Sequence, residues 1–128
     1  MRCSFWLVQS YSCIWVIRQL QSHGLRDLRR LYFSGNKLPR SFPTNQYYNL
    51  IYLELAMCQL SALPEDFASL VPNCRSLNLN HNFLESLQPL SGLVRLHRLS
   101  IVGSRLDDCS ALSAVVETLP ELETLDLR

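Results

Sequence analysis

The chain has 128 residues, which suits a single domain, and its formal net charge is +1. Hydrophobic residues make up 48% of the sequence and charged residues 18%, a balance that excludes disorder and predicts a packed core. The near-neutral charge does not indicate the basic excess that nucleic-acid binding requires, so no nucleic-acid partner is expected. The cysteines form no C-x-x-C pair, which favours free thiols in a reducing, intracellular compartment.

The first segment, residues 1–23, matches none of the repeats described below. Its apolar residues are interrupted at Gln9, Ser10 and Ser12, so it lacks both the apolar core of a signal peptide and the roughly 20 apolar residues of a membrane span. No membrane association is therefore expected. The segment is predicted to be an N-terminal extension or a short helical cap, with the helix over residues 14–20.

The remainder, residues 24–128, follows a repeated frame of eleven positions, L-x-x-L-x-L-x-x-N-x-L. Copies start at residues 28, 50, 74, 96 and 122, so successive starts lie 22 to 26 residues apart. This spacing is typical of leucine-rich repeats. The fifth copy contains only LETLDL, residues 122–127, so the repeat domain is predicted to be truncated at its C-terminal end.

Positions three to seven of the frame alternate with period two, which predicts a β-strand with one buried face. One such strand cannot bury its leucines alone, whereas stacked parallel copies form a continuous core. The predicted fold is therefore an α/β leucine-rich repeat solenoid. Short parallel strands line its concave face, and loops, 3₁₀ turns and short helices line its convex face.

Position nine lies where the chain turns away from the strand, and an asparagine amide there can bond to backbone groups that the turn leaves unpaired. Losing such bonds costs about 1–3 kcal/mol for each buried group. Cysteine and serine satisfy fewer groups, so two of the turns are expected to be weaker. The predicted ladder of turn residues is Asn36, Cys58, Asn82 and Ser104.

The segments that link the strands differ in their helix signals. Pro64 and Pro72 limit residues 61–73 to a short turn of 3₁₀ or α-helix. Residues 85–95 are predicted to form a brief turn. The best α-helix covers residues 108–121, and its inward stripe comprises Leu112, Val115, Val116 and Leu119.

The residues between the leucines face the concave side, where solenoids bind along an extended surface. Tyrosine and arginine are enriched at binding hot spots. The predicted protein-binding patch comprises Tyr32, Tyr52, Glu54, Asn78 and Arg98.

No catalytic pattern is found in the sequence. It has no phosphate-binding glycine loop, nucleophile elbow or zinc motif, so no enzyme, cofactor or metal is expected. His81 is interpreted as a surface residue of a turn. The adjacent carboxylates Asp107 and Asp108 are interpreted as helix-capping groups.

Residues 47–106 resemble a more specific family, the fungal spindle-pole-body scaffolds of the septation initiation and mitotic exit network, whose repeats are related to centriolin. The similar motifs are the pair Tyr47-Tyr48, LSALPEDF at 60–67, VPN at 71–73, LNLN at 77–80 and PLSGLVRL at 89–96. The resemblance implies a scaffold that recruits GTPase-linked kinases to the spindle pole. Members of that family are longer, and Ser104 stands where the family pattern has asparagine.

The predicted function is a non-catalytic protein–protein interaction scaffold in the cytoplasm or cytoskeleton, at the spindle pole body. The alternative is a leucine-rich repeat regulator or inhibitor of an enzyme such as a phosphatase or nuclease, which would occlude an active site with the same concave face. A third hypothesis, extracellular recognition, is disfavoured by the unpaired cysteines.

Overall fold

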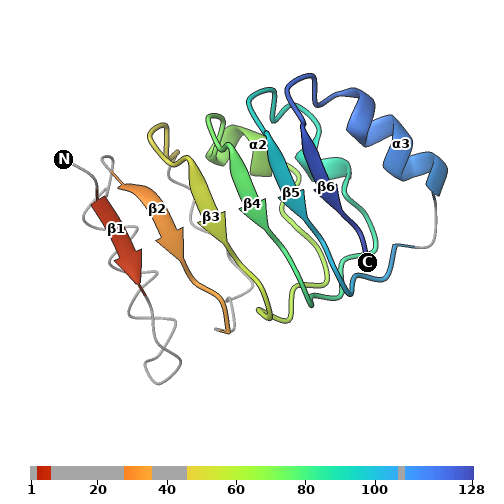
Figure 1. Ribbon diagram of the computed structural model, residues 1–128, viewed down its shortest axis with the longest axis horizontal. Coiled ribbons are helices and arrows are strands. Elements are labelled where there is room, and N and C mark those ends of the chain that lie inside the picture. The colour runs from red at the N-terminus through yellow and green to blue at the C-terminus, as the bar shows by residue number, and fades with distance from the viewer. Residues whose placement is uncertain (1–2, 7–27, 36–45, 107–108) are drawn as a thin grey trace.

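The computed structural model describes residues 3–6, 28–35, 46–106 and 109–128, with backbone alone for 3–6 and 109. Its strands form one parallel sheet in which each strand lies beside the next one in the chain (Figure 1). The strands are β1 (Cys3–Trp6), β2 (Leu28–Tyr32), β3 (Tyr52–Glu54), β4 (Ser76–Asn78), β5 (Arg98–Ser100) and β6 (Thr124–Asp126). The predicted solenoid is therefore confirmed.

Equivalent frame positions lie side by side across the sheet. Position three of β2 pairs with position three of β3 (Arg30 with Tyr52), and this register continues through β6. Position four therefore forms a row of leucines along the core: Leu31, Leu53, Leu77, Leu99 and Leu125. Burial of one leucine side chain contributes about 1.5–3 kcal/mol, so this shared interior supplies much of the stability.

Strand β1 extends the sheet before the first copy of the frame. It pairs in parallel with β2, and Phe5 lies opposite Leu31. The segment 1–23 was predicted as an extension or a helical cap, and the structure places a strand at its start. The predicted helix over residues 14–20 lies outside the described residues, as do Asn36 and the pair Asp107-Asp108.

Short helical elements lie in the segments that connect successive strands. They are α2 (Phe67–Leu70), the 3₁₀ turn η1 (Gln88–Leu90) and α3 (Cys109–Glu117), which lies beside β6 in Figure 1. Each buries apolar side chains, such as Phe67 of α2 and Val115 of α3. These elements fall within the linking segments that the sequence assigned to helical turns. None of the described helices is long and apolar enough to cross a lipid bilayer.

Position eight of the frame adopts a left-handed backbone conformation in all four complete copies. The φ angles are 79° at Gly35, 54° at Met57, 57° at His81 and 77° at Gly103. A residue with a Cβ atom is disfavoured there by about 1–2 kcal/mol, so two of the four turns carry strain. A Cβ atom on Gly103 would lie 2.8 Å from His81 Nδ1, so the glycine also makes room for the histidine of the preceding copy.

Candidate functional site

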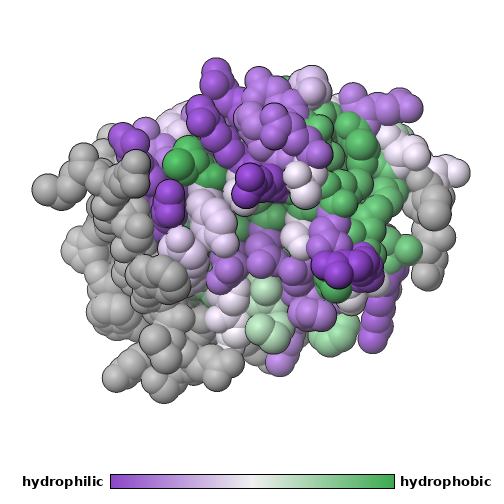
Figure 2. All heavy atoms as spheres, viewed as in Figure 1, coloured by the Kyte–Doolittle hydropathy of each residue, from purple (hydrophilic) through white to green (hydrophobic). Residues whose placement is uncertain are grey.

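The concave face is formed by positions three and five of the strands, which point away from the leucine core. At position five, Tyr32, Glu54, Asn78, Ser100 and Asp126 are all half-buried, and each lies beside its counterpart on a neighbouring strand. Figure 2 shows mainly polar residues over the described part of the face turned to the viewer. This surface is suited to contacts with another macromolecule, because its side chains are partly fixed yet remain accessible.

Two tyrosines lie in contact on this face. The rings of Tyr32 and Tyr52 lie with centroids 5.0 Å apart and an interplanar angle of 39°. The hydroxyl of Tyr52 donates a hydrogen bond to Glu54 Oε1 at 3.2 Å. Aromatic pairs at this separation are favourable, so the two rings and the carboxylate form a preorganised platform on β2 and β3.

Burial raises the pKa of Tyr52 above its ordinary value, and the charge of Glu54 and the hydrogen bond to it raise the pKa further. The nearby tyrosine Tyr32 acts in the same direction, whereas Arg30 lowers the pKa. Tyr52 therefore remains a protonated hydrogen-bond donor throughout the physiological range. Its bond to Glu54 holds the carboxylate at a fixed position on the face.

Asn78, another residue of the predicted patch, forms a hydrogen bond to the backbone of its own turn. Its Oδ1 accepts a hydrogen bond from the amide of Asn80 at 3.0 Å. Asn80 in turn reaches the next copy, where its Oδ1 accepts from Val102 N at 2.8 Å and from Ser100 Oγ at 2.6 Å. The oxygen of Asn78 is thus engaged within the fold.

Arg98 lies on β5, two strands away from Tyr52 in the register that joins Tyr52, Ser76 and Arg98. Its side chain is exposed. Farther along, Arg128 donates two hydrogen bonds to the carboxylate of Asp126, at 3.0 and 2.9 Å, and these bonds lower the pKa of Asp126. Arg98 thus lies two strands from Tyr52, and a single binding patch made of the five residues stays a prediction.

The turn residue Asn82 is 1% exposed, and its amide joins two copies of the repeat. Its Oδ1 accepts hydrogen bonds from Cys58 N at 2.9 Å and Leu60 N at 3.1 Å, both in the preceding copy. Its Nδ2 donates to Leu55 O and Leu79 O, each at 2.9 Å. The Asn82 side chain thus forms hydrogen bonds to backbone groups in both of the repeat copies that meet at this turn.

The two turns without asparagine at position nine differ from each other. Cys58 Sγ lies 3.4 Å from Phe33 O and from Ala56 O, so the thiol makes weak bonds to both copies that it joins. Ser104 Oγ is buried and has no hydrogen-bond partner among the described residues. The serine turn is therefore the less satisfied of the two.

The cysteines with described side chains, Cys58 and Cys74, are buried free thiols. Burial raises the pKa of Cys74 to about 12, because the ionised form would lose its hydration. Cys74 is therefore an apolar core residue that replaces the first leucine of its copy.

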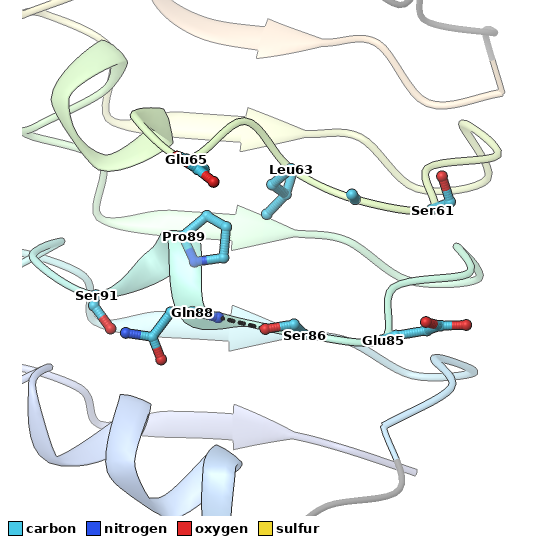
Figure 3. Close-up of a pocket in the computed structure, with 9 residues that line it drawn as sticks. Ser61, Leu63, Glu65, Glu85, Ser86, Gln88, Pro89 and Ser91 are labelled. Carbon is cyan, nitrogen blue, oxygen red and sulfur yellow. Dashed lines mark hydrogen bonds between the residues drawn. The ribbon is translucent and has the colours of Figure 1, made fainter.

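A pocket of about 630 Å³ lies between residues 61–65 and 85–91, which link successive strands (Figure 3). Its two acidic residues, Glu65 and Glu85, lie toward opposite ends of the view, and Gln88 N donates to Ser86 Oγ between them. Its lining therefore brings no pair of titratable groups together. Within the described residues, no group of three or more histidine, cysteine or carboxylate side chains is placed to hold a metal ion.

A second pocket, of about 320 Å³, lies at the edge where the chain enters the strands, and it was not predicted from the sequence. Arg29, Arg75 and Arg95 line it together with Tyr48, Ile51 and Asn73. These residues flank position one of the frame rather than lying between the strand leucines. An arginine next to position one in three separate copies is the signal that could have revealed this pocket.

Comparison with known proteins agrees with this architecture. A family model described as leucine-rich repeats in two copies matches residues 72–114. A crystal structure of internalin C2 from Listeria monocytogenes superposes with a TM-score of 0.68 and 26% sequence identity, covering 82% of this chain and 44% of that one. The chain therefore has the leucine-rich repeat fold, and its residues 72–114 match the repeats of that family.

Among curated proteins, the chain is similar to the septation initiation network scaffold protein cdc11 of Schizosaccharomyces pombe. The two are 36% identical over 102 residues, which is 80% of this chain. The matched region is 10% of the relative, so the chain spans about a tenth of that protein's length. The resemblance inferred from the sequence motifs is confirmed for the repeat region.

Proposed function

We propose that this chain is a non-catalytic protein-binding module of a scaffold, and that it holds its partner on the concave face. The leucine-rich repeat fold and the similarity to a named scaffold protein support a protein-interaction role. The single observation that carries the proposal is the platform of Tyr32, Tyr52 and Glu54, where two rings in tilted contact adjoin a carboxylate that accepts a hydrogen bond from Tyr52.

This platform favours a partner segment with a basic side chain. A cation can lie over the tyrosine rings, where the ring quadrupole attracts it, and can also approach the carboxylate of Glu54. Arg98, exposed two strands away, suits an acidic group farther along the same segment. A partner laid across β2 to β5 would therefore need charges of opposite sign at its two ends.

The proposed cellular role is that of a scaffold in septation initiation or mitotic exit signalling, inside the cell and at the spindle pole body. The proposed partners are components of GTPase-linked kinase signalling. The similar relative is named as a septation initiation network scaffold, which supports the septation part of this proposal.

The test replaces both Tyr32 and Tyr52 with alanine and compares capture of neighbours by proximity labelling in the source cell. We expect the double variant to lose the partner, because aromatic anchors at interfaces typically carry about 2 kcal/mol or more of binding energy. A matched control is Phe83→Ala, which removes an exposed aromatic ring outside the strands. Circular dichroism should be the same for all three proteins.

Unchanged capture by the double variant would remove the concave face from the proposal. Capture of a catalytic partner that loses its activity at one-to-one stoichiometry would favour the enzyme-regulator alternative. A tagged copy that labels no spindle-pole neighbours would overturn the septation role while leaving the fold unaffected.

A further inference from the structure

The arginine pocket, defined by Arg29, Arg75 and Arg95, concentrates positive charge in a molecule that is nearly neutral overall. Position two of successive copies forms a backbone column: Ile51 N donates to Arg29 O at 2.8 Å, and Arg75 N donates to Ile51 O at 2.9 Å. Arg29 and Arg75 therefore flank the smaller Ile51. Arg95 enters from the loop before the next strand, so the long side chains of three copies reach one pocket.

Another feature of the pocket is its ordered floor. Asn73 Nδ2 donates to Tyr48 O at 2.7 Å and thereby joins the loops of two successive copies. The hydroxyl of Tyr48 donates to Gln46 Oε1. The loops before β3 and β4 are thus joined at the pocket, and Arg75 directly follows the second of them.

The three guanidinium groups have no carboxylate partner among the described residues. The ion pairs found there are His97 with Glu121 and Arg128 with Asp126, and the pocket lining contains no acidic side chain. Arg29, Arg75 and Arg95 are all exposed. Three like charges in one cavity repel each other, and a compact anion with several oxygens would relieve that repulsion.

We propose that the arginine pocket binds a phosphorylated side chain of a protein segment. A phosphoserine or phosphothreonine carries about two negative charges and three strong acceptor oxygens, which match convergent guanidinium groups. The volume of about 320 Å³ suits one phosphoryl group with its side chain. The pocket lies at the entry edge of the strands, so the site is separate from the concave platform.

Charge distribution favours a protein ligand over a nucleic acid or a membrane. Binding to a nucleic-acid backbone requires a basic stripe that neutralises several phosphates in succession, whereas the net charge here is +1. Anionic membranes are recognised by clusters of about four to eight basic residues. One pocket with three arginines fits a single phosphorylated residue.

The test measures fluorescence anisotropy of a labelled degenerate peptide pool with one fixed phosphothreonine, against the same pool with threonine. We expect the chain to bind the phosphorylated pool and to leave the other unbound. Arg75→Gln should weaken binding by about tenfold or more, because it removes one charge-assisted partner. The matched control Arg105→Gln removes the same charge from an exposed residue that lies outside the strands and outside the pocket lining, and it should leave binding unchanged.

Acidification adds an independent readout. The second ionisation of a phosphate monoester has a pKa of about 6, so binding should weaken as the pH falls through that value. Equal binding of the two pools, or equal loss in Arg75→Gln and Arg105→Gln, would overturn the proposal. Tighter binding to a single-stranded oligonucleotide or to phosphoinositide vesicles than to the phosphorylated pool would also overturn it.

The tyrosine double variant separates this proposal from the proposed function. If Tyr32 and Tyr52 are replaced by alanine, capture of the cellular partner should fall while binding of the phosphorylated pool remains. Loss of phosphopeptide binding in that variant would place the ligand on the concave face and contradict the assignment to the arginine pocket.

Discussion

The turns at Asn82 and Ser104 occupy the same position in consecutive copies, yet they are held differently. Asn82 bonds to the backbone of the preceding copy through both ends of its amide, whereas Ser104 Oγ is buried without a partner in the described part of the chain. The comparison shows that a solenoid with a regular core has junctions of unequal strength. Its stability is then a sum of unequal nearest-neighbour terms.

The two copies that Ser104 fails to bridge are linked by a different side chain. At that junction Asn80, at position seven, accepts hydrogen bonds from Val102 N and Ser100 Oγ. At the earlier junction of β2 and β3, position seven is again used, since Ser34 Oγ accepts from Ala56 N at 3.0 Å. At the junction bridged by Asn82, position seven is the apolar Ala56. Side-chain oxygens at position seven therefore bridge the first and third of these junctions, and the amide at position nine bridges the second, while the Cys58 thiol adds weak bonds at the first.

Removing the stronger bridge is expected to have the largest effect. Asn82→Ala leaves Cys58 N, Leu60 N and Leu55 O without their partner, so we expect the free energy of unfolding to fall by about 3 kcal/mol or more. Urea unfolding followed by circular dichroism measures this change. Ser104→Ala is the matched control and should change stability by less than about 0.5 kcal/mol. Similar losses in the two variants would contradict the comparison.

Building the missing bridge should have an intermediate effect. In Ser104→Asn, the introduced amide would reach the amides of Asn82 and Leu84, which correspond to those of Cys58 and Leu60 one copy earlier. We expect a gain of about 2 kcal/mol from two newly satisfied buried groups. The same urea experiment measures it. A loss of stability would mean that the turn at Ser104 has closed around the smaller side chain.

The smallest of these effects concerns Cys74, the first core residue of the copy that contains Asn82. Burial raises its pKa from the ordinary thiol value of 9.0 to about 12, so above pH 9 the unfolded chain loses a proton that the folded chain retains. Stability is therefore fully present below that pH and falls above it, by about 1.4 kcal/mol per pH unit. Unfolding measured between pH 8 and pH 10 in the wild type and in Cys74→Ala tests this slope. Parallel pH profiles would show that Cys74 is not responsible.

Much of the fold could be predicted, because the spacing of the leucines indicates both the length of each repeat and the face of each strand that is buried. The alternation around Leu53, Leu77 and Leu99 predicts strands, and stacking predicts their parallel order. Strand β1 was not predicted, since Cys3–Trp6 lacks the frame and pairs with β2 through its backbone. Local sequence does not encode such an edge strand.

The candidate site was less predictable than the fold. The alternation of side chains along a strand predicts the side of the sheet on which Asn78 lies. It does not predict that the side-chain oxygen of Asn78 accepts a hydrogen bond from the amide of Asn80. The arginine pocket was missed for a related reason. Arg29, Arg75 and Arg95 come from separate copies and meet at a turn, where their proximity depends on the stacking distance rather than on sequence spacing.

The sequence neighbours Arg29 and Arg30 stand on β2 at the boundary between two surfaces. Arg29 lines the pocket at the sheet edge, while Arg30 faces the concave side opposite Tyr52. A single ligand folded over this edge would occupy both sites at once. Its second attachment would be intramolecular, with an effective concentration in the millimolar range for a short tether, so two weak contacts would combine into high avidity.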